Sequence, residues 1–202
     1  MYISKLNLVT DQKEIVDFIK RYSFGTIVTA VNNVANASHL PFVVSQRDGK
    51  TILTSHFAKA NTQWKELIGR DVLVIFTEPH AYISPKHYDK EQSVPTWNYI
   101  AVHAYGKARL IEESTAAVEV LESTINNYEA EYMAQWQRLP EDYKTKMIKG
   151  IVAFEIEVDS FQASKKLSQN KNEAEKQRII NALTDSPHQT DQEIGRYMAK
   201  EQ

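Results

Sequence analysis

The chain contains 202 residues, of which 42% are hydrophobic and 25% are charged, and its formal net charge is -2. A chain of this length and composition buries a sizeable core without covalent staples. The small net charge excludes a global positive field that would draw the protein onto nucleic acid or anionic lipid. Because cysteine is absent, disulfides, thiolate nucleophiles, zinc fingers and iron–sulfur clusters are also excluded.

No segment has the character of an export signal or a membrane span. Residues 1–7 lack an apolar stretch and a cleavage motif, and no apolar run approaches the length that crosses a bilayer. The lack of cysteine also fits a reducing compartment. We therefore expect a cytoplasmic protein without a membrane partner.

The first quarter of the chain predicts one helix followed by short strands. Apolar residues at i, i+3, i+4 and i+7 predict a helix over 15–22. Asp11 and Glu14, which precede this pattern, are expected to cap the start of the helix. Pro41 indicates an edge position or a bulge in one of the strands. Strands are predicted at 26–30, 37–45 and 51–55. The turns between them are predicted at Asn32-Asn33 and Asp48-Gly49.

The middle of the chain predicts a helix over 62–68, which Gly69 ends. Residues 85–95 are expected to form a long loop, and long loops in compact domains are often functional. Further strands are predicted at 71–77, 81–84 and 96–111, with Pro79 separating the first two.

The last part of the chain combines helices with one more strand. We expect an amphipathic helix over 118–132, a short helix opened by Pro140 and a strand over 151–158. Beyond residue 171 the predicted elements are a helix over 173–183 and a last helix that Thr190 and Glu193 cap. We divide the chain into a main domain, 1–171, and a helical C-terminal tail, 172–202.

The six or seven predicted strands are not spaced as regular βαβ units. This spacing favours an α+β, mostly β fold over a doubly wound sheet, specifically an antiparallel barrel with inserted helices. The six glycines form neither a G-x-G-x-x-G nor a Walker motif, which argues against Rossmann or P-loop nucleotide binding. Without H-E-x-x-H or paired histidines on a helix, no metal site is predicted.

A strand end followed by a helix start concentrates groups that suit an anion. Unpaired backbone N–H groups at a helix start and the helix dipole attract negative charge. Lys59 adds a full charge there, and the other donors of this segment are Thr54, Ser55, His56, Asn61 and Thr62. The alternative is that Asn61 or Thr62 only caps the helix while Lys59 faces solvent. The density of donors favours the anion site.

Three other places leave both a functional and a structural interpretation open. His39 beside Pro41 would donate to a ligand ring or a phosphate, although a backbone-bonded structural histidine is favoured. Trp97, His103 and neighbouring tyrosines alternate on one face of a strand, as a stacking platform, a subunit interface or plain core. The segment 165–171 would clamp a phosphate or contact DNA, although its composition favours a solvated loop.

Seven motifs follow one another along the chain. They are Ser-Phe-Gly-Thr-Ile-Val-Thr (23–29), His-Leu-Pro (39–41), His-Phe-Ala-Lys-Ala-Asn (56–61), Pro-His-Ala-Tyr-Ile-Ser-Pro (79–85), Val-Pro-Thr-Trp-Asn-Tyr (94–99), Val-His-Ala-Tyr-Gly-Lys (102–107) and Lys-Leu-Ser-Gln-Asn-Lys (166–171). Seven collinear motifs are far more specific than any one of them. Together they resemble the PaiB family of FMN-binding negative transcriptional regulators, and the resemblance extends from residue 1 to about residue 175.

The resemblance implies an FMN-binding split β-barrel, similar to pyridoxamine-phosphate oxidase and flavin reductase-like domains, with FMN in a groove of a homodimer. It further implies three groups of cofactor-binding residues. The residues that would hold the phosphate of FMN are Thr54, Ser55, His56, Lys59 and Asn61. Those that would lie near the flavin ring or at the dimer interface are His39, Trp97, Asn98 and His103. Those that would close the site are Lys166, Ser168, Gln169 and Asn170. Related oxidases use an arginine-rich phosphate grip, whereas this chain has Lys59 and no arginine there.

The function that the resemblance implies is negative transcriptional regulation of protease-synthesis and sporulation-type genes, with DNA as a candidate partner. The sequence itself has no helix-turn-helix signature, and residues 165–202 carry seven Lys/Arg against six Asp/Glu. The alternatives are a small FMN-dependent oxidoreductase or flavin reductase, with His39 and His103 as candidate acid or base, and a split barrel that holds another planar cofactor such as haem.

Overall fold

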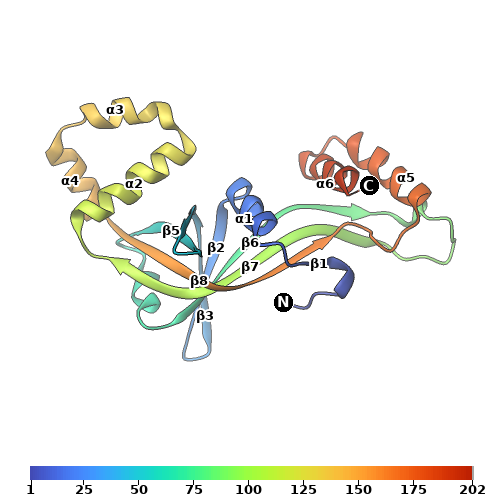
Figure 1. Ribbon diagram of the computed structural model, residues 1–202, viewed down its shortest axis with the longest axis horizontal. Helices are drawn as coiled ribbons and strands as arrows, with labels where there is room; N and C mark the ends of the chain where they lie inside the picture. Colours follow the sequence, from blue (N-terminus) through green and yellow to red (C-terminus); the bar gives the residue numbers. More distant parts are fainter. Residues whose placement is uncertain (202) are drawn as a thin grey trace. The chain divides into compact units, whose positions relative to one another are not determined.

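The computed structural model describes residues 1–201, and their strands form one mostly antiparallel sheet (Figure 1). The strand order is β3-β2-β6-β7-β8-β5-β4, and β1 pairs with β8 outside this path. The strands are β1 (Leu8–Val9), β2 (Phe24–Val31), β3 (Val34–Pro41), β4 (Val43–Arg47), β5 (Lys50–Ala58), β6 (Asp71–Ile83), β7 (Thr96–Ile111) and β8 (Ile151–Lys166). The mostly β class that the sequence predicts is confirmed.

Helices lie in several connections between the strands, and two more follow β8. The α-helices are α1 (Gln12–Arg21), α2 (Ser114–Tyr128), α3 (Met133–Arg138), α4 (Glu141–Lys149), α5 (Glu173–Thr184) and α6 (Gln189–Lys200). Short 3₁₀ helices are η1 (Lys5–Asn7), η2 (Thr62–Leu67), η3 (Pro85–His87) and η4 (Ala130–Tyr132). None of the helices within residues 1–201 has the length and apolar character needed to cross a bilayer.

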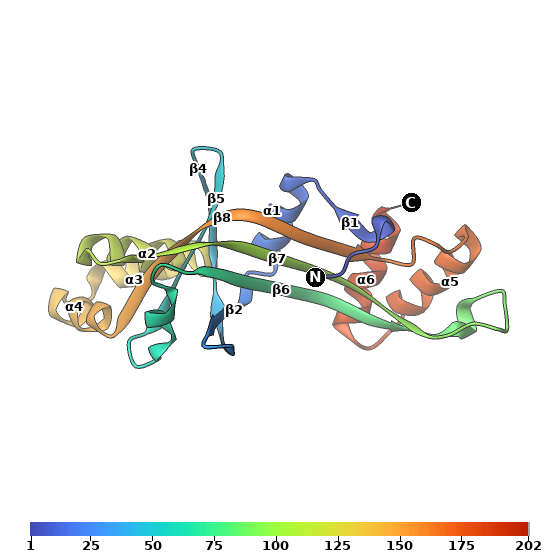
Figure 2. The same cartoon turned by 90° about the horizontal axis from the view of Figure 1, so that it is seen from below.

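The chain divides into two compact units. Unit 1 contains residues 1–15, 77–102 and 162–201, and unit 2 contains residues 16–76 and 103–161. Unit 1 includes the C-terminal helices α5 and α6, which lie side by side in both cartoon views (Figures 1 and 2). The division of the chain at residue 171 stays a prediction.

Both predicted hairpin turns are present in unit 2. Asn32 and Asn33 have φ values of 53° and 62°, and Asp48 and Gly49 have φ values of 52° and 77°. Two consecutive left-handed residues match the twist of the flanking strands, which is why Asn-Asn and Asp-Gly suit these positions. They join β2 to β3 and β4 to β5, and Figure 2 shows the second of these hairpins.

Three predicted strand boundaries are wrong. The strand predicted at 37–45 is two strands, because β3 ends at Pro41 and the fully buried Phe42 leaves the sheet, donating its N–H to the carbonyl of Ser23 at 2.8 Å. The two strands predicted around Pro79 are one, since β6 continues through this buried proline to Ile83. Strand β8 also extends eight residues beyond the predicted end at Val158, to Lys166.

Helix starts are only partly predicted by sequence. Asp11 accepts the N–H groups of Lys13 and Glu14 at the start of α1, as expected. The predicted cap of the last helix at Thr190 is wrong, because α6 begins at Gln189, one residue before Thr190. The capping box occurs instead at Asn172 and Glu175, which open α5 with reciprocal bonds.

Four phenylalanines form the centre of the core in unit 2. The ring of Phe42 lies edge-on to Phe76 and Phe154, with centroids 5.7 Å and 6.3 Å away, and Phe57 stacks on Phe154 at 5.1 Å. All four side chains are fully buried. Edge-to-face and stacked pairs of this kind add to the free energy gained from burial alone.

Gly106 on β7 allows β7 and β8 to approach closely in unit 2. A Cβ atom at this position would lie 2.2 Å from the backbone oxygen of Glu157 and 2.9 Å from a methyl carbon of Ile156. We expect Gly106→Ala to destabilise the protein by at least about 1–3 kcal/mol, because backbone has to move. Urea unfolding measures this, with the exposed neighbour Lys107→Ala as control at roughly 0.5 kcal/mol or less. Equal urea midpoints for Gly106→Ala and the wild type would contradict the close approach.

Candidate functional site

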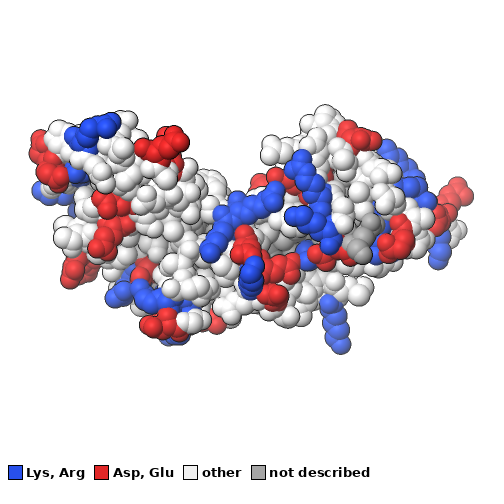
Figure 3. Space-filling model, turned by 45° about the horizontal axis from the view of Figure 1, so that its top comes forward, with Lys and Arg blue, Asp and Glu red and all other residues white. Residues whose placement is uncertain are grey.

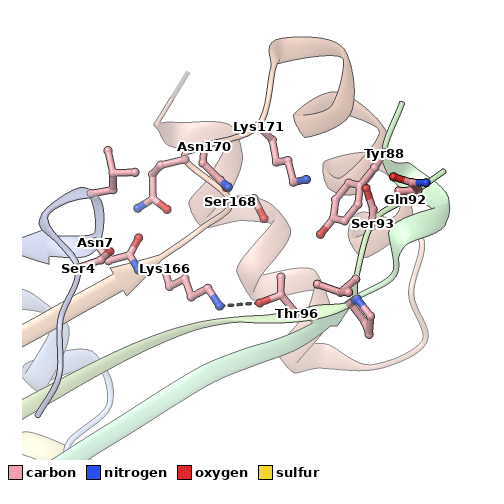
Figure 4. A pocket seen from close by; sticks show the side chains of 14 residues that line it. Ser4, Asn7, Tyr88, Gln92, Ser93, Thr96, Lys166, Ser168, Asn170 and Lys171 are labelled. Atoms are coloured by element: carbon pink, nitrogen blue, oxygen red, sulfur yellow. Dashed lines mark hydrogen bonds between the residues drawn. The ribbon is translucent and has the colours of Figure 1, made fainter. Parts of the chain in front are cut away.

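A pocket of about 550 Å³ lies within unit 1 (Figure 4). It is formed by the segment before β1, the loop before β7 and the end of β8 with the turn that follows it. Its lining residues are Ser4, Leu6, Asn7, Tyr88, Gln92, Ser93, Val94, Pro95, Thr96, Lys166, Ser168, Gln169, Asn170 and Lys171. The lining therefore combines two lysines with hydroxyl and amide groups, and it includes no carboxylate from residues 1–201.

The turn after β8 is held in one conformation by its own hydrogen bonds. Ser168 adopts a left-handed backbone with φ of 60°, and its carbonyl accepts the N–H of Lys171 at 3.0 Å. The side chain of Gln169 accepts the N–H of Leu167 at 2.8 Å. The buried Ser168 hydroxyl donates to Asn98 Oδ1 at 3.1 Å, which ties the turn to β7. The pocket wall is thus preorganised.

The lysines of the pocket meet neutral partners. Lys166 Nζ donates to the hydroxyl of Thr96 at 2.6 Å, and Lys171 Nζ lies 3.4 Å from the ring centroid of Tyr88 (Figure 4). Side chains alternate along a strand, so the neighbouring Lys165 points elsewhere and pairs with Glu14 and Glu201. Burial raises the pKa of Tyr88, which keeps the phenol neutral. The arrangement favours an anion in the pocket.

The segment that the sequence singles out for a phosphate, Thr54–Asn61, belongs to unit 2. Ser55 is buried and donates its hydroxyl to the carbonyl of Pro41 at 2.6 Å. Asn61 accepts the N–H of Gln63 at 3.1 Å and donates to the hydroxyl of Ser38 at 2.8 Å. The helix expected after it is a six-residue 3₁₀ helix, η2, with only a short array of peptide dipoles. Most donors of this segment are therefore engaged within the fold.

His56 and Lys59 differ from these donors, because their side chains have no hydrogen-bond partner among residues 1–201. Lys59 is exposed, and its backbone N–H donates to the carbonyl of Gly150 at 2.8 Å. The Nδ1 atom of His56 is buried and has no hydrogen-bond partner among residues 1–201. Burial lowers the pKa of His56, so its ring is neutral at pH 7. Thr54 lines a different pocket, which lies in unit 2 and is described below.

The residues expected near a ring are placed in both units. In unit 1, Trp97 is 52% exposed and forms an aromatic cluster with His80 and Tyr82, whose centroids lie 5.6 Å and 6.0 Å from its own. In unit 2, the exposed His39 accepts from or donates to Thr26 Oγ1 at 2.9 Å. The Nδ1 atom of His103 is buried without a partner among residues 1–201, and burial lowers its pKa.

Asn98 has a supporting position in unit 1 rather than an exposed one. Its amide is fully buried, accepts the Ser168 hydroxyl and donates to the sulfur of Met198 on α6 at 3.4 Å. Four residues expected to close a cofactor site line the pocket of unit 1, namely Lys166, Ser168, Gln169 and Asn170. Lys171, which also lines the pocket, ends the segment 165–171 that the sequence indicates as a phosphate clamp. Tyr88 and Thr96 were not selected individually, although Tyr88 lies in the long loop 85–95 that the sequence marks as functional.

A second pocket, of about 530 Å³, lies within unit 2, and Glu155, Arg47 and Arg109 are among its lining residues. Arg47 binds the Glu155 carboxylate through two nitrogens at 3.0 Å and 2.7 Å, and Arg109 binds it at 3.1 Å and 2.7 Å. Glu112, Glu113 and Glu119 also line this pocket, so its cations are compensated. The sequence did not indicate this cluster, because its three members are far apart in the chain. It lacks the excess positive charge of the pocket in unit 1.

Comparison with known proteins agrees with these features. Residues 1–160 match the family described as "Putative FMN-binding domain", and the chain belongs to this family. It is similar to "Protease synthase and sporulation protein PAI 2" of Bacillus subtilis (strain 168), with 42% identity over 91% of this chain and 89% of that protein. A fungal relative from Emericella nidulans is 28% identical over 91% of this chain and 90% of its own length. The resemblance to the PaiB family is confirmed.

Solved structures of low sequence identity share the fold. The flavocytochrome Anf3 from Azotobacter vinelandii aligns with a TM-score of 0.64 at 16% identity, covering 82% of this chain and 72% of that chain. The FAD and heme binding protein from Mycobacterium smegmatis aligns with a TM-score of 0.62 at 14% identity, covering 79% and 73%. The fold is therefore a split β-barrel, as the sequence predicts, and its sheet is not closed.

Glu155 should govern part of the acid stability of unit 2. Hydrogen bonds from Arg47 and Arg109 lower the pKa of this carboxyl, so its stabilising effect is complete above the unfolded pKa and is lost as pH falls through the lower folded value. We expect Glu155→Gln to cost about 1–3 kcal/mol at pH 7. The difference from the wild type should shrink below about pH 4.

Urea unfolding at several pH values measures this difference. Glu157→Gln is the matched control, because Glu157 lies on the same strand and pairs with Lys50 at a more exposed site. We expect the control to cost about 1 kcal/mol or less. A pH-independent difference for Glu155→Gln would contradict the assigned role of its charge.

Proposed function

We propose that this chain is an FMN-binding negative transcriptional regulator of the PaiB type, acting as a cytoplasmic homodimer. The observation that carries the proposal is the match of residues 1–160 to the FMN-binding family. The 42% identical relative is named for protease synthesis and sporulation, which supports a regulator of that type.

The side chains present suit the chemistry of FMN. Its phosphate requires cations and N–H or O–H donors, and its flat ring requires an aromatic surface. In unit 1, Lys166 and Lys171 are candidates for the phosphate, because they line a pocket that has no acidic lining residue among residues 1–201. In unit 1, the half-exposed Trp97 offers a surface for stacking. Bound FMN would supply redox chemistry or a ligand signal, while the protein binds and orients it.

A homodimer and a DNA contact are the further parts of this proposal. Trp97 and Tyr82 expose aromatic surface in unit 1, and such surface is enriched at subunit interfaces. Basic and acidic side chains are interspersed over the face shown in Figure 3, so it has no wide area of one sign. DNA binding would therefore use a local basic surface that the two-fold symmetry of a dimer repeats.

FMN binding is tested by titrating the purified protein into FMN and following the quenching of flavin fluorescence. We expect saturable binding at one FMN per protomer. Trp97→Ala should weaken FMN binding by about two- to tenfold, because a stacking partner of the ring is lost. Tyr143→Ala is the matched control, since Tyr143 is an exposed aromatic residue on α4 and should leave the affinity unchanged. A protein that never quenches flavin fluorescence would refute FMN binding.

Regulation is tested by selecting bound sequences from a random duplex DNA library and measuring gel shifts with the selected DNA. We expect binding that weakens as salt rises, since cations on the protein displace counterions from phosphates. FMN should change the DNA affinity if it is the signal, and sedimentation should give the mass of a dimer. Absence of DNA binding, together with NAD(P)H oxidation faster than that of free FMN, would favour a flavin oxidoreductase instead.

A further inference from the structure

The pocket of unit 1 contains more positive charge than the surrounding protein neutralises. Lys166 and Lys171 line it and are half-buried, while none of its lining residues is acidic. Among residues 1–201, neither lysine forms an ion pair. A cation removed from water without a counter-ion is unfavourable, which favours the arrival of an anion.

Lys165, the neighbour of Lys166 on β8, is an example of a lysine whose charge is neutralised within the fold. Lys165 has a largely buried side chain, and it binds the carboxylates of both Glu14 and Glu201. One residue further along the strand, Lys166 has the hydroxyl of Thr96 as its only partner within the described part of the chain. Two adjacent lysines of one strand thus have opposite electrostatic surroundings, and only Lys165 is neutralised.

The neutral groups of the pocket add to the selection of the ligand. Thr96, Ser93 and Asn170 bring hydroxyl and amide groups to the same pocket as the two lysines (Figure 4). Several N–H and O–H donors around two cations match the three oxygens of a phosphate group. The volume of about 550 Å³ is sufficient for a small phosphorylated molecule.

We propose that the pocket of unit 1 is an anion site in which Lys166 and Lys171 hold a phosphate group. The group has two possible sources, which share the same chemistry. One is the phosphate of FMN, and this version rests on the proposed function. The other is a separate phosphorylated small molecule that the protein binds as an effector. In both versions the cations of the site are Lys166 and Lys171 rather than Lys59.

The contrast with Lys59 follows from the surroundings of the two places. Near Lys59, the Ser55 hydroxyl donates to the carbonyl of Pro41. The Asn61 side chain donates to the hydroxyl of Ser38 and accepts the N–H of Gln63. Lys59 itself is exposed, where water already solvates its charge. The pocket of unit 1 instead offers two half-buried lysines, for which an arriving phosphate replaces lost hydration.

The first experiment is a calorimetric titration of the purified full chain with inorganic pyrophosphate at low ionic strength. We expect wild-type protein to bind, and Lys166→Met and Lys171→Met each to weaken binding about tenfold, as expected for the loss of one charged contact. Lys59→Met is the matched control and should bind like the wild type. Lys171→Arg keeps the charge and should retain most of the affinity.

The second experiment identifies the source of the phosphate by comparing FMN with riboflavin, which lacks it. If Lys166→Met weakens FMN binding but not riboflavin binding, the group is the phosphate of FMN. If the variant loses pyrophosphate and keeps the wild-type affinity for FMN, the pocket serves a separate phosphorylated molecule. Circular dichroism melts confirm that each variant is folded, and Lys171→Met provides the result should Lys166→Met fail to fold.

Three results would overturn the anion site. They are absence of pyrophosphate binding by the wild type, unchanged binding in either pocket variant, and loss of binding in Lys59→Met. Failure of the proposed function has a different signature, because wild-type protein would then bind pyrophosphate in the pocket while it binds neither FMN nor riboflavin. The two proposals can therefore fail independently.

Discussion

The alternation of side chains along β8 is the constraint on which most of this structure depends. In unit 2, Phe154 and Ile156 point into the core, while Glu155 between them faces Arg47 and Arg109. In unit 1, the same alternation sends Lys165 to its carboxylate partners and Lys166 to the pocket. A shift of one residue in register would exchange these faces, so core, ion cluster and pocket are specified together.

The two clusters of charge in this protein differ in kind. Glu155 binds both of its arginines in unit 2, which satisfies an acidic group that is largely buried. The pocket of unit 1 has lysines whose partners are a hydroxyl and an aromatic ring. A satisfied cluster fixes the fold, whereas an unbalanced one provides free energy for binding a ligand. This difference separates a structural group of charges from a candidate ligand site.

The turn after β8 shows how the fold prepares the pocket before any ligand binds. Ser168, which has a left-handed backbone, is anchored to the buried Asn98 on β7, and Asn98 also contacts Met198 on α6. The position of the turn is therefore set by β7 and α6 as well as by its own sequence. A site prepared in this way loses little conformational entropy when it binds a ligand.

The elements that could be predicted from the sequence are those whose cause is local. The Asn32-Asn33 and Asp48-Gly49 turns, the Asp11 cap and the strand after Gly150 follow from short-range conformational preferences, and seven collinear motifs identified the family. Which polar groups keep no partner could not be predicted, because this depends on contacts between residues that are distant in the chain and meet only in the fold. Ser55 and Asn61 resemble ligand donors in sequence and bond within the fold, whereas Tyr88, Thr96 and Lys171 meet only when β7 and β8 are brought together.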